Sequence, residues 1–290
     1  MQNLNQVGNN TYYIKGHANT GIYDMGGGDV ILFDTGATVE EGELIIEVLK
    51  SHGWKPSLIL YTHAHHDHVA GHGLITNEYG IKGYCSPEEV LFGQNRRYFN
   101  NSLYGGPMPK GIDEASNPPV YLEYIKDCHI PDGIECLSCP GHNLGDLIYK
   151  TPDDVWFIGD ALIPRRAIEK SRIAYEYDFP KHVESLNLLG SLGSVPAVMG
   201  HGAPEEDLAW FADYTRDIES ATVEEVLWLC NEPVSRDDII KYFLDKSADK
   251  YAFKRYNTLH WTFTGILTFL VNKDMVTCSM ENNRQIFKRL

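Results

Sequence analysis

The chain is expected to form a layered α/β body followed by a smaller helical region. Over the first 200 residues, short β-like runs alternate with helical or loop segments, which favours sheets covered by helices. After Pro204 the apolar residues recur at helical spacing instead. With 43% hydrophobic residues among 290, the chain has enough apolar side chains to bury a sizeable core.

The strands expected in the body are short and rich in apolar residues. They are 11–15, 29–33, 57–61, 81–85, 134–138, 146–150, 155–158 and 197–199. Helices are expected where apolar positions recur every three or four residues, over 40–51, 69–79 and 181–190. Segment 93–119 is rich in Gly, Pro and Asn, so we expect a long loop or a lid there.

Three helices and a terminal hairpin are expected after Pro204. The first helix ends before Pro233, and Ser235 with Asp238 forms a capping box that opens the second. The third helix is expected over 258–272 and the hairpin over 275–288. This order is typical of a winged helix.

The charge distribution also suggests two units. The net charge is −15, yet residues 222–290 hold 10 Lys and Arg against 9 Asp and Glu. We therefore place one domain, the layered body, at 1–221 and a winged-helix-like C-terminal domain at 222–290. Because phosphate contacts need cationic surface, the acidic body disfavours nucleic-acid binding, and only the basic C-terminal tail offers a route to it.

The composition favours a soluble cytoplasmic protein without a membrane partner. The first residues are polar, unlike a secretory signal, and no window reaches the ~18 uninterrupted apolar residues of a membrane span. Six cysteines in 290 residues fit a reducing compartment. The oligomeric state stays open, with a homodimer as one alternative.

The strongest chemical signal is Thr62-His63-Ala64-His65-His66-Asp67-His68, between an expected strand and an expected helix. On an extended backbone His63 and His65 face the same side, and the following turn lets Asp67 and His68 approach the same space. Neutral imidazole and carboxylate suit zinc, iron or manganese. A solvated histidine tract is the simpler alternative, but such tracts usually lie at termini or in disordered loops.

Three further residues of ligand type, His142, Asp160 and His201, each follow a glycine. Taken singly, each could be an ordinary turn or helix-cap residue. Taken with the cluster, they supply enough ligands for two ions, because one zinc uses only three or four protein ligands.

Together these motifs resemble the metallo-β-lactamase superfamily over roughly residues 10–203. The shared features are the H-x-H-x-D-H string, Pro140-Gly141-His142, Gly159-Asp160, Gly200-His201-Gly202 and, upstream, Asp34-Thr35-Gly36. The resemblance implies an αββα sandwich with the site at one edge. It also implies that His63, His65 and His142 hold one metal ion, that Asp67, His68 and His201 hold the other, and that Asp160 bridges them, with Asp34 close by.

The expected function is therefore a hydrolase with two divalent ions, zinc first and iron or manganese as alternatives. Zinc lowers the pKa of bound water from about 16 to about 7, giving a metal-bound hydroxide at neutral pH. This hydroxide would attack a small-molecule substrate, namely a thioester, lactone or other ester. Asp67, both a ligand and a free carboxylate edge, would act catalytically by steering the proton of the water.

Departures from four subfamilies leave the substrate open. Zinc β-lactamases usually have a cysteine at the position of Asp160, and flavin-linked diiron relatives have a glutamate at the position of His65. Acyl-homoserine lactonases have a tyrosine at the position of Ile163, and glyoxalase II enzymes differ over 161–166.

A metal-dependent ribonuclease or phosphodiesterase is the alternative enzyme, since some superfamily members cleave RNA and carry a winged-helix-like tail. A regulatory binding module and a mononuclear iron oxygenase are further alternatives. Among weaker candidates, His17 could overhang the site, and Tyr175 or Tyr177 could offer a phenol to the substrate oxygen.

Overall fold

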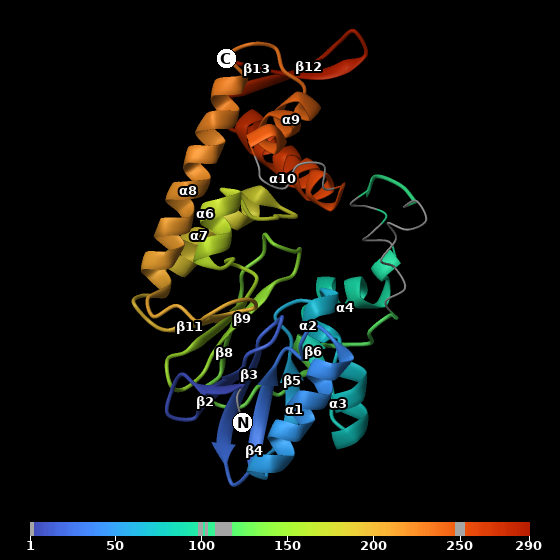
Figure 1. Cartoon of the computed structure of the whole chain (residues 1–290), viewed down its shortest axis with the longest axis vertical. Helices are drawn as coiled ribbons and strands as arrows, with labels where there is room; N and C mark the ends of the chain where they lie inside the picture. The colour runs from blue at the N-terminus through green and yellow to red at the C-terminus, as the bar shows by residue number, and fades with distance from the viewer. Residues whose placement is uncertain (1–2, 98–100, 102–103, 108–117, 247–252) are drawn as a thin grey trace.

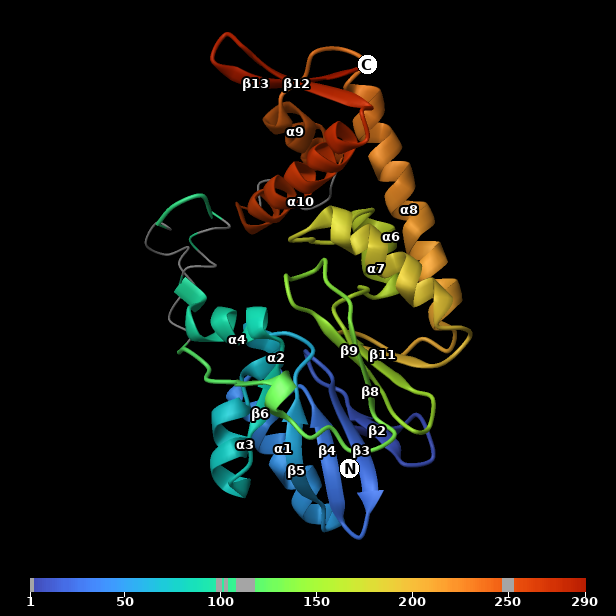
Figure 2. The same ribbon diagram turned by 180° about the vertical axis from the view of Figure 1, so that it is seen from behind.

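The computed structural model describes residues 3–97, 101, 104–107, 118–246 and 253–290. Two β-sheets lie face to face, and helices cover the outer face of each (Figure 1; seen from behind in Figure 2). This arrangement confirms the predicted αββα class. The loop or lid expected over 93–119 falls largely outside the described residues.

The first sheet is half antiparallel and half parallel. Its seven strands, in spatial order, are β1 (Leu4–Gln6), β2 (Thr11–Ile14), β3 (Thr20–Gly26), β4 (Asp29–Phe33), β5 (Lys55–Leu60), β6 (Gly83–Cys85) and β7 (Glu123–Tyr124). Strands β1 to β4 pair antiparallel, and β4 to β7 pair parallel. The parallel half needs crossovers. These contain α1 (Val39–His52), α2 (His66–Val69), α3 (His72–Tyr79) and α4 (Pro87–Gln94).

The second sheet is smaller. Its strands, in spatial order, are β11 (Ala197–Met199), β10 (Trp156–Gly159), β9 (Leu147–Lys150) and β8 (Glu135–Ser138). Only β10 and β11 pair parallel. The crossover between these two strands contains α6 (Arg165–Ser171) and α7 (Phe179–Ser191).

Alternation along the strands builds the layers, because successive side chains point to opposite faces. In β4, Ile31 and Phe33 pack between the two sheets, whereas Val30 and Leu32 pack against the outer helices. Phe157 of the second sheet enters the same central layer, and its ring stacks on Phe33 with centroids 4.4 Å apart. The two sheets are thus held together by an apolar layer, and polar residues gather beyond the strand ends.

The helix expected over 69–79 is in fact part of two helices, α2 and α3, which are separated around Gly71. The Gly71 N–H donates to Thr35 O at 3.2 Å, and a Cβ at Gly71 would lie 2.5 Å from that oxygen. The segment after β4 lies so close to Gly71 that it interrupts the helix. This is a tertiary contact, and the helical spacing of apolar residues does not predict it.

The C-terminal region contains α8 (Leu208–Leu229), α9 (Arg236–Lys246), α10 (Phe253–Asn272) and the hairpin of β12 (Val276–Glu281) and β13 (Arg284–Arg289). The expected capping box opens α9. Asp238 N donates to Ser235 Oγ at 3.3 Å, and Ser235 N donates to an Asp238 carboxylate oxygen at 3.4 Å. Within the described ranges, no helix has the length and apolar character that a membrane crossing requires.

Helix α8 belongs to both parts of the molecule, because it continues through residue 221. Leu208 and Phe211 near its start pack against the second sheet. Val226 and Leu227 near its end join a separate apolar cluster with α9 and α10. That cluster also includes Phe179 of α7, so the C-terminal helices pack directly on the body. The boundary at 221 and the winged-helix identity remain predictions.

A partly buried ionic contact helps to fix the C-terminal helices. Glu225 of α8 accepts hydrogen bonds from Arg172 at 2.6 Å, Tyr242 at 2.6 Å and Lys246 at 2.5 Å. Burial alone would raise the pKa of Glu225, but these partners outweigh it and lower that pKa to about 2. A carboxylate whose pKa is depressed by folding stabilises the native state wherever it is ionised.

We expect Glu225→Gln to lower the free energy of unfolding by about 2 kcal/mol at pH 7, the scale of hydrogen bonds to a charged group. The difference from wild type should be complete above the ordinary pKa near 4.5 and should shrink as pH falls toward 2. Chemical denaturation at several pH values would measure it. A difference that stayed constant down to pH 2 would contradict the role of the ionised carboxylate.

Candidate metal centre

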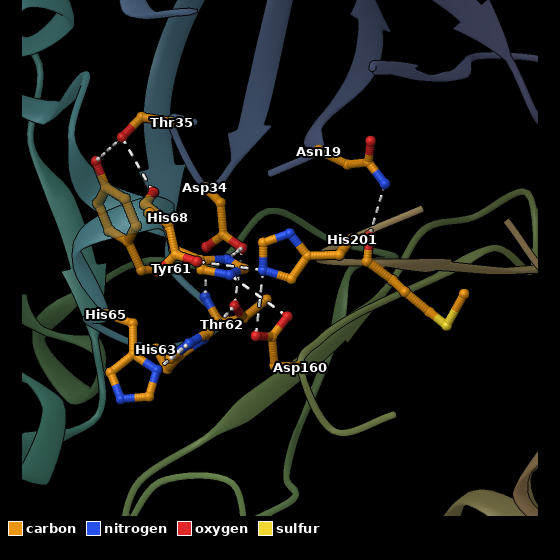
Figure 3. Close-up of polar contacts among 12 residues, drawn as sticks. Asn19, Asp34, Thr35, Tyr61, Thr62, His63, His65, His68, Asp160 and His201 are labelled. Atoms are coloured by element: carbon orange, nitrogen blue, oxygen red, sulfur yellow. Dashed lines mark hydrogen bonds and ion pairs between the residues drawn. The ribbon is translucent and has the colours of Figure 1, made fainter. Parts of the chain in front are cut away.

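The seven residues predicted as ligands come together beyond the ends of β5, β10 and β11. His63 and His65 follow β5, whereas Asp160 and His201 follow β10 and β11 of the other sheet (Figure 3). Among these seven residues, ligand-type atoms converge in three sets, in which the atoms lie within 4.8 Å of one another. The sets are His63, His65 and His142; His63, His68 and Asp160; and Asp67, His68 and His201.

The first set consists of three imidazoles. His65 Nδ1 lies 3.0 Å from His63 Nε2 and 3.0 Å from His142 Nε2. Burial lowers the pKa of all three residues, to about 3 for His65. Three neutral imidazoles with converging nitrogens form a donor set that suits a divalent cation.

Asp160 extends toward both sides of the site. Its Oδ1 lies 3.4 Å from His68 Nε2, and its Oδ2 lies 3.4 Å from His201 Nε2 and 3.6 Å from His142 Nε2. Asp67 Oδ2 lies 3.2 Å from His201 Nε2. Burial alone would raise the pKa of Asp160, but His68, His201 and His142 hold it well below its usual range.

His68 and His201 therefore face carboxylates. Burial opposes protonation of His201, but Asp160 and Asp67 raise its pKa to about 10. Burial likewise opposes protonation of His68, and Asp160 with Asp34 raises its pKa well above the usual range. A positive charge at these Nε2 atoms, whether a proton or a metal ion, is stabilised by the surrounding carboxylates.

Asp34 orients one histidine directly and another through Thr62. His68 Nδ1 donates to Asp34 Oδ2 at 2.8 Å, and the Thr62 hydroxyl donates to the same oxygen at 2.8 Å. Since that hydroxyl proton is used, Thr62 Oγ1 accepts from His63 Nδ1 at 3.1 Å. Both rings thus direct Nε2 into the site, and in neutral His63 this atom is a free lone pair.

Main-chain carbonyls orient two more rings. His142 Nδ1 donates to Tyr175 O at 3.1 Å, and His201 Nδ1 donates to His17 O. A carbonyl can only accept, so Nδ1 carries the proton and Nε2 faces the site. His63 and His142 therefore place lone pairs on either side of His65 Nδ1, which carries one proton at most. A cation bonded to all three nitrogens satisfies this arrangement, so the residues present fit a metal ion.

Glycines before the ligands are required by close packing. A Cβ at Gly200 would lie 2.2 Å from Asp160 Oδ1 and 2.5 Å from His68 Cε1. Gly159 has φ +51°, and a Cβ there would lie 2.5 Å from Thr62 Oγ1. The recurrent order of strand, glycine and ligand therefore lets two strand ends approach the site without side chains between them.

A buried glutamate that no sequence pattern marks as functional connects the loop after β5, which holds His63 and His65, to the loop between β8 and β9, which holds His142. Glu89 of α4 accepts hydrogen bonds from Ala64 N at 2.8 Å, Asn143 Nδ2 at 2.9 Å and Gly145 N at 3.1 Å. Ser86 and Glu89 have capping-box spacing, which indicates a helix start. The spacing gives no sign that the carboxylate reaches away from its own helix.

The segment that supplies the Tyr175 carbonyl is held by three helices. Ala174 N donates to Glu219 of α8 at 3.3 Å, and Glu176 N donates to Thr262 of α10 at 3.1 Å. His182 of α7 lies between the two buried carboxylates, 2.8 Å from Glu219 and 3.3 Å from Glu176. The C-terminal helices thus contact, through one segment, the group that orients His142.

The weaker candidates have other roles. The His17 side chain is 86% exposed and pairs with Glu41, so this residue contributes its carbonyl rather than its ring. Tyr175 lies against the site, its ring centroid 5.4 Å from that of His142. Tyr177 packs instead on Trp261.

The chain is similar to known proteins. The model of the metallo-β-lactamase superfamily matches residues 13–201. The chain is 32% identical over 135 residues to "Probable metallo-hydrolase YqgX" of Bacillus subtilis, a match that covers 46% of this chain and 60% of that protein. It is 27% identical over 146 residues to a hydroxyacylglutathione hydrolase of Cereibacter sphaeroides, covering 49% and 46%. The matched part thus spans about half the length of these curated relatives.

Solved structures resemble the whole fold, including the C-terminal region. A β-lactamase domain protein from Burkholderia ambifaria superposes with a TM-score of 0.77 at 15% identity, covering 99% of this chain and 93% of that one. A metallo-β-lactamase family protein from Thermus thermophilus gives 0.68 at 19% identity, covering 94% of each. At these identities the likeness shows the fold alone. The family match, which extends over more than half of the sequence, shows that the chain belongs to the metallo-β-lactamase superfamily.

Proposed function

We propose that this protein is a hydrolase that binds two divalent metal ions and cleaves a small thioester, lactone or other ester. The position of Asp160 supports this proposal most directly, because its carboxylate lies 3.4 to 3.6 Å from ring nitrogens on both sides of the site. In the proposed assignment, His63, His65 and His142 would hold one ion, and Asp67, His68 and His201 would hold the other. Asp160 would be a ligand of both ions.

Bound metal ions would supply a lowered pKa for water and positive charge against the oxyanion that develops at the substrate carbonyl. The chain's own residues supply placement. The side chains of Asp67 and His201 are 44% and 31% exposed, against 10% for Asp160 and 0% for His68. Substrate and water therefore approach from the side of Asp67, whose carboxylate can accept a proton from the attacking water.

Tyr175 is a candidate donor to the substrate oxygen. Its hydroxyl is buried and has no hydrogen-bond partner in the described part of the chain. Burial raises the pKa of this phenol well above its usual value, so the proton stays on the oxygen at neutral pH. The relatives named hydroxyacylglutathione hydrolase support a thioester, since the name denotes hydrolysis of an acylated glutathione.

We expect purified protein to hold two divalent ions per chain and to hydrolyse the acetyl thioester of methyl 3-mercaptopropionate. A chelator should abolish turnover and added zinc should restore it. Because this substrate is neutral, its rate should change little between low and moderate salt. Metal analysis and a thiol-release assay would test both points. One iron per chain without ester turnover would contradict the proposal.

The nuclease alternative is tested on the same protein. Replacing the tail residues Lys273, Arg284, Lys288 and Arg289 with glutamine should leave thioester turnover unchanged. Each phosphate contact of a single strand contributes about 0.7 to the salt slope of binding, so a nuclease that relies on this tail should lose activity in the variant. If the wild type cleaved RNA efficiently and the variant did not, the ester proposal would be wrong and the nuclease alternative would be favoured.

A further inference from the structure

A cavity of about 360 Å³ lies between the body and the C-terminal helices, next to the metal centre. Tyr175 lines it, and the same tyrosine ring packs edge to face on the ring of His142, with centroids 5.4 Å apart. Tyr175 therefore borders the cavity and also contacts a proposed metal ligand. Its volume falls in the range of small-molecule sites, about 300–1,000 Å³.

The cavity is lined by four basic side chains, and the described residues that line it include no acidic one. Lys170 and Arg172 come from the end of α6 and the residue after it. Lys246 ends α9, and Arg255 lies in the first turns of α10. The basic residues thus come from opposite walls, although residues 1–221 as a whole carry 15 Lys and Arg against 31 Asp and Glu.

A carboxylate that contacts two of these residues, Glu225, lies outside the lining. Glu225 bonds to both Arg172 and Lys246 and so fixes the positions of these two side chains. Arg172 also has φ +64°, a left-handed conformation that usually selects glycine or asparagine after a helix. A long cationic side chain therefore occupies a position that glycine would occupy with less backbone strain.

We propose that this cavity is a subsite for an anionic group, a carboxylate or a phosphate, carried by the ester that is cleaved at the metal centre. The inference rests on the proposed function and narrows its substrate to an anionic ester. Guanidinium and ammonium groups from two walls can bond the oxygens of one anion, and such charge-assisted bonds are among the strongest in proteins. A neutral ester of the same size gains nothing from them.

Binding can be tested without turnover. Calorimetric titration of zinc-loaded protein with inorganic phosphate compares wild type, Lys170→Gln and Arg255→Gln, which alter opposite walls. Any affinity of phosphate for the metal ions is common to all three. The control is Lys241→Gln on the exposed side of α9, which pairs with Asp245 and lies outside the cavity. We expect affinity to fall about tenfold in both cavity variants and to be unchanged in the control. Equal affinities in all four proteins, or no binding by wild type, would overturn the subsite.

Kinetics then identify the anion. The first pair of substrates compares the acetyl thioester of 3-mercaptopropionate, which carries a carboxylate, with the acetyl thioester of methyl 3-mercaptopropionate, which is neutral. The second pair compares acetylpantetheine 4′-phosphate, which carries a phosphate, with neutral acetylpantetheine. In the cavity variants, KM should rise about tenfold for the charged member of one pair, with kcat and the neutral members unchanged. Equal changes for charged and neutral members would overturn the proposal. Absence of turnover for all four, with cavity-dependent phosphate binding retained, would instead refute the ester-hydrolase proposal and leave the anion site standing.

Discussion

A protein with Asp160 replaced by asparagine is expected to lose at least one of its two metal ions and to turn over substrate at least about 100-fold more slowly. Even the hydrogen-bond partner of a metal ligand typically contributes about 10- to 100-fold, so a bridging ligand should contribute more. Asparagine keeps one neutral oxygen and places an amide group where the second oxygen lay. It therefore cannot present carboxylate oxygens both to His68 and to His201, which Asp160 does at 3.4 Å each.

Metal quantitation and steady-state kinetics on the same preparation measure this effect. The matched control is Asp154→Asn, because Asp154 also lies in the second-sheet region, is 73% exposed and has a left-handed backbone that asparagine tolerates. The control should keep both ions and full activity. If the Asp160 variant kept two ions and an unchanged rate, Asp160 would not be the ligand shared by the two metal ions.

The sequence predicts the layered fold well where local pattern and tertiary structure agree. Strands such as β4 and β10 have apolar residues on both faces because each is covered on both sides, and such runs are easily recognised. Strand β3 was missed because Gly21, Asp24 and Gly26 are typical of turns. Glycine is nonetheless required at position 21, since a Cβ there would lie 2.3 Å from a ring carbon of Phe157. Glycine is needed at this position because of a residue on the other sheet, so the sequence around Gly21 does not reveal the strand.

The same limit applies to the site. All seven proposed ligands have reactive side chains in short motifs, and the structure brings them together. The groups that orient them often have no such signature. His201 is oriented by the main-chain oxygen of His17, 184 positions away, and His142 by that of Tyr175. Any residue type supplies a carbonyl, so these partners follow only from the folded backbone.

Replacing Asp34 with asparagine is expected to weaken metal binding by about 10- to 100-fold and to lower activity in proportion, although Asp34 is not a proposed ligand. Its buried carboxylate accepts three hydrogen bonds at 2.8 Å, from Thr62 N, the Thr62 hydroxyl and His68 Nδ1. Asparagine has one acceptor oxygen, and its amide group would face a donor. The ring of His68 and, through Thr62, that of His63 would both lose the partner that fixes their orientation.

The backbone should not obscure this result. Asp34 has φ +60°, a left-handed conformation that asparagine adopts as readily as aspartate, so the substitution adds no strain of its own. Asp274→Asn is the matched control, because Asp274 has φ +54° and is exposed.

Unsatisfied buried donors should also cost about 1–3 kcal/mol each in stability. Thermal unfolding of apoprotein would measure that loss, and metal competition at a temperature where both variants are folded would measure affinity. Reduced stability with unchanged metal affinity would show that Asp34 supports the fold alone, whereas loss of both would show that one carboxylate orients two proposed ligands, His63 and His68.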